Sequence, residues 1–197
     1  MARMKFLCDA ERCIECNACV TACKNEHEVP WGINRRRVVT LNDGVPGERS
    51  ISVACMHCTD APCAAVCPVD CFYQTEQGVV LHSKELCIGC GYCFYACPFG
   101  APQYPQAGNF GTRGKMDKCT FCSGGPAEDE AQEFELYGRN RLAEGKLPLC
   151  AEMCSTKALL AGDGDVIADI YRQRVASRGF GSGAWGWGDA YQMKSGT

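Results

Sequence analysis

Long apolar runs and an excess of basic charge are both missing from this sequence. The longest stretch without a charged residue, 87–112, is interrupted by Pro98, Pro102 and Pro105, so it cannot form a continuous membrane helix. The formal net charge is -3, which offers no positive field to a nucleic acid backbone. The start of the chain reaches charged and polar residues before an apolar segment of signal-peptide length has formed, so we expect no export signal. These absences predict a soluble protein without a transmembrane segment that binds no nucleic acid.

Cysteine, by contrast, is abundant, and sixteen of the 18 cysteines fall into four sets that each end in CxxxC. The sets, numbered one to four along the sequence, are Cys13, Cys16, Cys19, Cys23; Cys55, Cys58, Cys63, Cys67; Cys87, Cys90, Cys93, Cys97; and Cys119, Cys122, Cys150, Cys154. Sets one and three share the spacing CxxCxxCxxxC, set two widens one gap to four residues, and set four has 27 residues after its first CxxC. Such repetition indicates an internally duplicated chain.

This pattern is typical of iron–sulfur ligation, because a cubic cluster needs four thiolates and a tight CxxCxxC loop supplies three of them. In the bacterial ferredoxin run CxxCxxCxxxCP the fourth cysteine binds the other cluster of a pair. Proline follows sets two and three, as Pro68 and Pro98, whereas Lys24 and Ser155 stand at that position in sets one and four. We therefore predict an inner pair, sets two and three, enclosed by an outer pair, sets one and four.

The ferredoxin rule exchanges the last cysteine within each pair. The four predicted ligand groups, A to D, are Cys13, Cys16, Cys19 with Cys154 (A); Cys119, Cys122, Cys150 with Cys23 (B); Cys55, Cys58, Cys63 with Cys97 (C); and Cys87, Cys90, Cys93 with Cys67 (D). Each group would hold one 4Fe-4S cluster, and we predict no catalytic residue on this chain. Cys8 and Cys71 are left over, and we interpret them as small buried side chains beside the clusters.

Two other uses of cysteine compete with clusters. Disulfides suit exported chains and usually show irregular spacing. Structural zinc is held by two CxxC pairs separated by a loop, and set four alone resembles that arrangement. Three cysteines in one tight loop fit a cluster better than zinc, so a zinc-stapled structural protein is the less favoured interpretation.

Longer motifs surround these cysteines: CMHCTDAPCAAVCP at 55–68, CPFGAPQY at 97–104, KCTFC at 118–122 and LPLCAEMCSTKALLAGD at 147–163. They resemble the four-cluster, ferredoxin-like subunits of molybdopterin oxidoreductases. Three further stretches are similar to the iron–sulfur beta subunit of molybdenum or tungsten formate dehydrogenases, namely VPWGINRRRVV at 29–39, GRNRLAEGKLPLC at 138–150 and RGFGSGAWGWG at 178–188. The resemblance covers essentially the whole chain. CPVDCFY at 67–73 also resembles seven-iron ferredoxins, in which the second cysteine is not a ligand.

The resemblance implies an electron-transfer subunit without a substrate site. Formate would be oxidised to carbon dioxide at a molybdopterin in a catalytic partner subunit, and this chain would pass the electrons to a membrane cytochrome b subunit or another acceptor. Two alternatives stay open: a subunit of another molybdopterin or tungsten oxidoreductase, acting on aldehydes, sulfur or nitrogen compounds, and a free-standing polyferredoxin. The subunit would be cytoplasmic, or carried to the periplasmic face of the inner membrane by its catalytic partner.

The fold class that follows is α+β, with two ferredoxin-like modules, one inserted within the other. The outer module would comprise 1–50 and 105–164, and the inner module 51–104. The apolar spacing in 165–178 predicts a helix, with Val166, Ile167 and Ile170 near one face. We interpret the remaining tail, which ends at residue 197, as a docking arm for the catalytic subunit. A shield over this chain's own clusters is the alternative.

Four basic residues are placed near the predicted clusters: Arg35, Arg36, Arg37 and Lys118. Their charge could raise the reduction potentials of those clusters or meet an acidic partner. An exposed strand edge explains the arginines equally well, because charged side chains protect such edges from pairing with other chains.

Overall fold

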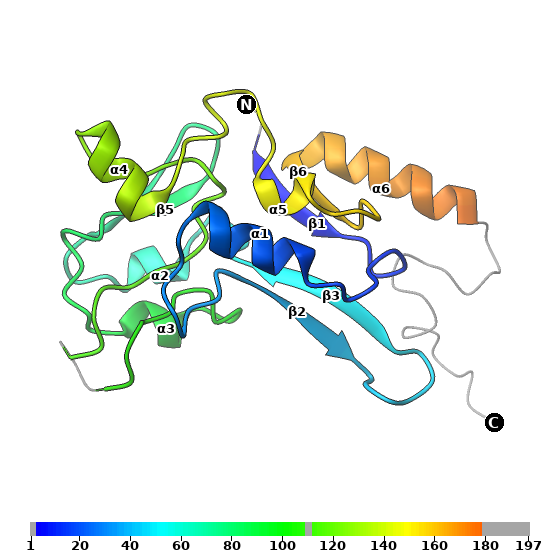
Figure 1. Cartoon of the computed structure of the whole chain (residues 1–197), viewed down its shortest axis with the longest axis horizontal. Helices are drawn as coiled ribbons and strands as arrows, with labels where there is room; N and C mark the ends of the chain where they lie inside the picture. Colours follow the sequence, from blue (N-terminus) through cyan, green and yellow to red (C-terminus); the bar gives the residue numbers. More distant parts are fainter. Residues whose placement is uncertain (1–2, 109–111, 179–197) are drawn as a thin grey trace.

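The computed structural model describes residues 3–108 and 112–178, in which the strands form separate two-stranded antiparallel sheets (Figure 1). In these sheets β1 (Met4–Cys8) pairs with β6 (Leu159–Asp163), β2 (Arg36–Leu41) with β3 (Arg49–Ala54), and β4 (Phe72–Gln74) with β5 (Val80–His82). Short helices stand between small antiparallel sheets, so the fold is α+β, as predicted.

The β1–β6 sheet joins the two ends of the cysteine-bearing part of the chain. Its register pairs Met4 with Asp163 and Cys8 with Leu159, so all sixteen cysteines of the four sets lie between its strands in sequence. Inward-facing Leu159 and the ring of Phe6 pack in a core that also contains the fully buried Phe121. Burial of these apolar side chains, rather than the few backbone hydrogen bonds of a two-stranded sheet, stabilises the pairing.

Four short helices each contain the third cysteine of one set. They are α1 (Ala18–Glu26), α2 (Pro62–Ala65), α3 (Tyr92–Ala96) and α5 (Leu149–Glu152), which contain Cys19, Cys63, Cys93 and Cys150. Asn17 and Gly91, which precede α1 and α3, have left-handed backbones with φ of 57° and 85°, so the polypeptide turns sharply before these two helices. Helix α1 contacts α5, and α2 contacts α3, which brings together the sets that the spacing paired.

Two further helices contain no cysteine. Helix α4 (Glu130–Tyr137) begins at Asp129, whose carboxylate accepts hydrogen bonds from the amides of two residues in the first turn. Helix α6 (Gly164–Arg178) confirms the predicted helix and packs along β1 and β6. Its buried face is narrower than predicted, because only Ile167 is buried while Val166 and Ile170 are exposed. Among the helices that the structure describes, none combines the length and the apolar character needed to cross a bilayer.

Candidate metal centres

The four cysteines of predicted group A line one cavity, together with Val38, Ala158 and Leu159. Three of these cysteines come from the loop before α1 and from its first turn, and Cys154 arrives from the other end of the sequence. The amide of Leu159 donates a 3.4 Å hydrogen bond to Cys154 Sγ. The wall also contains Cys8 and the polar residues Asn17, Ser52 and Thr156. The four sulfur donors of group A are the donor set that a 4Fe-4S cluster takes.

Group C lines a second cavity of the same kind. Cys55, Cys58, Cys63 and Cys97 contribute to it, together with apolar residues that include Pro98. Lys118 also lines this cavity and is fully buried. The first three cysteines precede or begin α2, whereas Cys97 directly follows α3. The packing of α2 on α3 therefore brings the fourth sulfur to the other three.

The thiols of group B are all buried, with exposed fractions of 4–7%. Burial raises the pKa of Cys23 well above its usual value, and the charges of Cys119, Cys150 and Cys122 raise it further. In group D, Cys67, Cys87 and Cys93 contribute to one apolar cluster. Among residues 3–108 and 112–178, no three Cys, His, Asp or Glu side chains converge on the position of a single ion. A cubane makes a different demand, because its four ligands bind four separate iron atoms.

Burial also raises the pKa of several of these thiols. It raises the pKa of Cys119 to about 11 and that of Cys122 to about 12, and the charges of neighbouring cysteines add to the shift. Burial likewise raises the pKa of Cys63 to about 11. At neutral pH these thiols are protonated in the apo protein, so cluster assembly must release their protons.

Cys71 and Cys8 lie beside predicted ligands. Cys71 is 3% exposed, and its Sγ lies 3.5 Å from that of Cys67, to which its amide also donates a 3.4 Å hydrogen bond. A hydrogen bond from Cys71 is the main cause that lowers the pKa of Cys87 below its usual value. Cys8 lines the cavity of group A and accepts a 3.2 Å hydrogen bond from the amide of Ser52. Both side chains thus contact the walls of predicted cluster sites.

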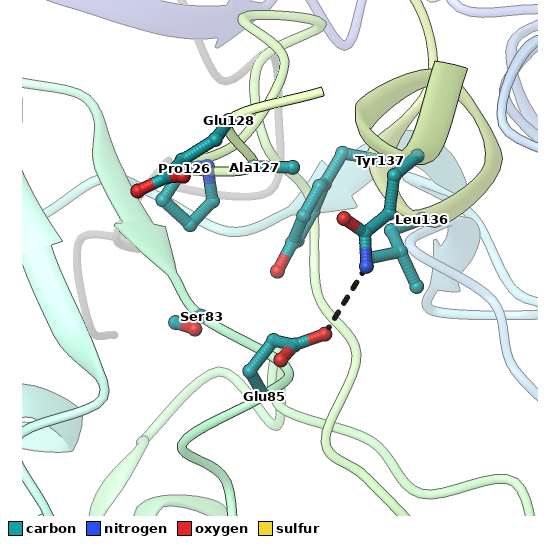
Figure 2. A pocket seen from close by; sticks show the side chains of 8 residues that line it. Ser83, Glu85, Pro126, Ala127, Glu128, Leu136 and Tyr137 are labelled. Atoms are coloured by element: carbon teal, nitrogen blue, oxygen red, sulfur yellow. Dashed lines mark hydrogen bonds between the residues drawn. The ribbon is translucent and has the colours of Figure 1, made fainter. Parts of the chain in front are cut away.

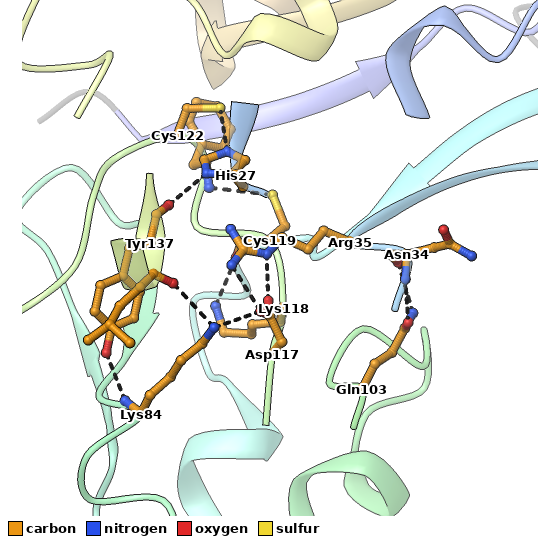
Figure 3. Close-up of polar contacts among 12 residues, drawn as sticks. His27, Asn34, Arg35, Lys84, Gln103, Asp117, Lys118, Cys119, Cys122 and Tyr137 are labelled. Atoms are coloured by element: carbon orange, nitrogen blue, oxygen red, sulfur yellow. Dashed lines mark hydrogen bonds and ion pairs between the residues drawn. The ribbon is translucent and has the colours of Figure 1, made fainter. Parts of the chain in front are cut away.

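A buried ionic network that the sequence did not reveal lies next to group B (Figure 3). Arg35 Nε and Nη2 donate to the two carboxylate oxygens of Asp117 at 2.5 and 3.0 Å, and Lys84 Nζ donates to the same carboxylate at 2.8 Å. Arg35 and Asp117 are separated by 82 residues in sequence, so no local pattern indicates the pair. Arg35 and Arg36 are 3% and 2% exposed, so the exposed-edge interpretation of these two arginines is wrong.

No sequence pattern indicated the contacts of His27, which lies at the end of α1. Its Nδ1 lies 2.6 Å from the carbonyl oxygen of Tyr137, and its Nε2 lies 3.2 Å from Cys122 Sγ (Figure 3). Burial is the main cause that lowers the pKa of His27, to about 4. A histidine four residues after the last cysteine of set one carries no sequence signal for a contact with set four, because the fold alone joins the two sets.

A different cavity, of about 300 Å³, contains no cysteine (Figure 2). Ser83 and Glu85 lie on one side of it, and the loop at 126–128 and the side chain of Tyr137 form the other walls. Gln132 Nε2 donates a 3.4 Å hydrogen bond to Glu85 across its edge. Without a sulfur donor, it is not a candidate cluster site.

Comparison with known proteins agrees with the cysteine chemistry. Residues 49–133 match the 4Fe-4S dicluster domain family. The formate dehydrogenase iron–sulfur subunit of Wolinella succinogenes is 64% identical over 195 residues, covering 97% of this chain and 98% of the relative. The protein belongs to the family of iron–sulfur electron-transfer subunits. It is a non-catalytic subunit of an oxidoreductase complex, which confirms the resemblance found in its motifs.

Other members of this family serve different oxidoreductases. The thiosulfate reductase electron transfer subunit PhsB of Salmonella typhi is 35% identical over 188 residues, covering 88% of this chain and 87% of the relative. The B subunit of the anaerobic dimethyl sulfoxide reductase of Escherichia coli K12 is 34% identical over 165 residues, covering 78% of this chain and 70% of the relative. These lower identities place the protein nearer to the formate dehydrogenase subunit than to either reductase subunit.

Proposed function

We propose that this chain holds four 4Fe-4S clusters and relays electrons from a molybdopterin subunit that oxidises formate to carbon dioxide. The observation that carries the proposal is the lining of two cavities by two complete ligand groups, A and C, each with its last cysteine from a distant set. The 64% identity to a formate dehydrogenase subunit over almost the full length of both proteins supports formate as the electron source. The clusters supply one-electron redox chemistry, and the protein supplies ligands, spacing and charge.

Two nested modules account for these ligand groups. In the proposed outer module, residues 1–50 and 105–164, the β1–β6 sheet and the α1–α5 contact bring sets one and four together. In the proposed inner module, residues 51–104, the β4–β5 hairpin links set two to set three and α2 packs on α3. These contacts support exchange of the last cysteine within each pair.

Apolar packing between the groups supports an order for the relay. Cys19 of group A shares a buried cluster with Cys150 of group B, and Cys119 of group B shares another with Cys55 of group C. Cys63 of group C packs with Cys87 and Cys93 of group D. Electrons would therefore step along the series A, B, C, D in one direction or the other.

Partners stand at both ends of such a relay in our proposal. One is the molybdopterin subunit, and the other is a membrane cytochrome b subunit or another electron acceptor.

The predicted docking arm, 179–197, lies outside the described residues. Deleting it is expected to leave the iron content unchanged and to weaken co-purification with the catalytic subunit. Loss of a cluster with normal co-purification would instead support the shielding alternative. The compartment, cytoplasm or periplasmic face, would follow the catalytic partner.

The test is the metal content and reduction of the anaerobically purified complex. We expect about 16 iron and about 16 sulfide in each copy of this subunit, and reduction of the clusters by formate, followed by electron paramagnetic resonance. About eight iron in the intact complex would contradict the four groups. Full iron content without reduction by formate would favour another molybdopterin or tungsten oxidoreductase. Reduction of the clusters by an aldehyde, or oxidation of previously reduced clusters by thiosulfate or dimethyl sulfoxide, would then identify its substrate. An intact, iron-loaded subunit that purifies with no partner would favour a polyferredoxin.

A further inference from the structure

The three consecutive arginines at the start of β2 lie in three different environments. Arg35 is paired with Asp117, whose carboxylate also accepts a hydrogen bond from Lys84. Arg37 is half-buried and donates to the backbone carbonyls of Phe99 and Gly100. Arg36 is 2% exposed, and among the residues that the structure describes no carboxylate forms an ion pair with it.

The hydrogen bonds of Arg36 are also incomplete. Its Nη1 donates a 3.0 Å hydrogen bond to Ser52 Oγ, and its guanidinium carbon lies 4.3 Å from the centre of the Phe6 ring. Its Nε and Nη2 are buried and have no hydrogen-bond partner. A buried cation with free N–H groups is strongly destabilising unless a negative group compensates it.

Cysteines lie around Arg36, and as thiolate ligands of a cluster they would provide that compensation. Burial by itself lowers the pKa of Arg36, but the charges of Cys150, Cys119, Cys23 and Cys19 outweigh it and raise the pKa above its ordinary value. The first three belong to ligand group B and the last to group A. Ser52 links Arg36 to group A, because its Oγ accepts from Arg36 and lies 3.3 Å from Cys19 Sγ. Phe6 links Arg36 to group B, because its ring lies against the guanidinium and packs on the apolar clusters that contain Cys150 and Cys119.

We propose that Arg36 is the buried counter-cation of the two outer clusters, A and B, and that its charge raises their reduction potentials. The inference rests on the ligand groups proposed above. A cluster with four thiolate ligands carries net negative charge, and each added electron increases it. A fixed positive charge nearby stabilises the reduced form, and Nε and Nη2 are free to donate to sulfur. Deprotonation of an arginine is negligible in proteins, so the effect is present throughout the working pH range.

Lys118 provides an internal contrast. It is the buried cation at the cavity of group C, but its Nζ already donates to the carbonyl oxygens of Val80 and Cys119. Two of its three N–H groups are therefore used within the protein, whereas Nε and Nη2 of Arg36 are buried without a hydrogen-bond partner. Arg35 also has a buried Nη1 without a partner among the described residues, but Asp117 pairs with it. Of the two buried arginines, Arg36 is the one without a carboxylate partner in the part of the chain that the structure describes, so the counter-cation role is assigned to it.

The experiment is a redox titration of the purified complex by electron paramagnetic resonance, with iron content measured on the same samples. Arg36→Met removes the charge and keeps a side chain of similar length. We expect two of the reduction steps to move to lower potential, with a change of about tenfold or more in each reduction equilibrium, or about 59 mV for one electron. The remaining steps should stay at their wild-type potentials.

Two variants serve as controls. Arg37→Gln makes the same change in net charge one residue along the strand and should leave clusters A and B unchanged. Arg36→Lys keeps the charge and should retain wild-type iron and most of the potential. Should Arg36→Met lose iron while Arg36→Lys keeps it, the requirement for charge is supported.

Several outcomes would overturn the inference. They are unchanged or raised potentials in an iron-replete Arg36→Met complex, an equal shift in Arg37→Gln, and loss of iron from Arg36→Lys. A wild-type complex that lacks the outer clusters altogether would instead contradict the proposed ligand groups, so the two failures are distinguishable.

Discussion

The inner and outer cysteine regions are closed by different parts of the polypeptide. Sets two and three lie within residues 55–97 and are linked by the short β4–β5 hairpin. Sets one and four depend on β1 and β6, whose register joins Met4 to Asp163. A short loop costs less entropy to close than a long one, so the inner region can form locally whereas the outer region requires most of the polypeptide to be in place.

The two regions also differ in the charge that faces the predicted clusters. Lys118 lines the inner cavity of group C and is hydrogen-bonded to backbone carbonyls, whereas Arg36 has free N–H groups among outer cysteines. The ion pair of Arg35 with Asp117 lies at the junction, because Asp117 directly precedes Lys118. The similar cysteine patterns of the two regions therefore lie in two different electrostatic environments. Such a difference allows one protein to hold clusters of different reduction potential.

The largest expected effect comes from removing one ligand in each region. Cys150→Ala in α5 and Cys63→Ala in α2 should each lose one cluster, about a quarter of the iron, because a cubane needs four thiolates. Iron analysis and electron paramagnetic resonance measure the loss. Cys71→Ala is the matched control and should keep all the iron. If it loses as much as Cys63→Ala, Cys71 is a ligand and group D has been assigned wrongly.

The next largest effect is a loss of stability in the apolar core that contains Phe121 and residues of β1 and β6. Phe121 is fully buried, and its ring centre lies 4.3 Å from that of Phe6. Phe121→Ala should lower the free energy of unfolding by about 3–5 kcal/mol, because it removes a buried aromatic ring and leaves a cavity. Phe94→Ala, on the inner helix α3, removes the same ring from a site that is 43% exposed and should change stability by about 0.5 kcal/mol or less. Thermal unfolding measures the stability of both variants. An equal loss of stability in the two would contradict the expected difference between the buried and the exposed position.

A substitution of Asp117 tests the ion pairs at the junction between the inner and outer regions. Asp117→Asn leaves Arg35 and Lys84 without their carboxylate and should destabilise the protein by about 3 kcal/mol. Burial alone would raise the pKa of Asp117, but Arg35 and Lys84 together lower it well below its usual value. A depressed carboxyl pKa contributes stability above the unfolded pKa, about 4, so the difference from wild type should shrink as the pH falls below that value.

A matched control exists for the Asp117 substitution. Glu144→Gln removes one carboxylate from the more exposed pairs with Arg139 and Lys146, and at neutral pH it should destabilise the protein much less than Asp117→Asn does. Denaturant unfolding at several pH values compares the two variants. A pH-independent loss in Asp117→Asn would show that the ion pair does not carry the effect.

The smallest expected effect lies outside both regions. Asp129 accepts hydrogen bonds of 2.7 and 3.3 Å from the amides of Ala131 and Gln132 at the start of α4. Asp129→Ala should cost about 1 kcal/mol through loss of this cap and should leave the iron content unchanged. Circular dichroism during thermal unfolding, with iron analysis, checks both parts. Iron loss here would mean that α4 supports a cluster.

Much of the site chemistry could be predicted from local spacing. The CxxC and CxxxC separations are short, and a ligand loop is determined by residues a few positions apart, so the sets could be read directly. The family and the electron-transfer role followed from the same motifs, and the helix at 165–178 followed from its apolar period. The narrower buried face of that helix depended on β1 and β6, which come from elsewhere in the sequence.

The amino-acid sequence was therefore enough to predict the iron ligands and to identify the class of protein that carries them. Only the tertiary structure decided what surrounds those residues: the pairing of β1 with β6, the contact of His27 with Cys122, and the separate environments of Arg35 and Arg36. The reason is physical, because local spacing specifies contacts within a loop, whereas burial and charge pairing depend on side chains tens of residues away. Whether an arginine meets a carboxylate, a carbonyl or a group of cysteines is settled when those distant segments pack together.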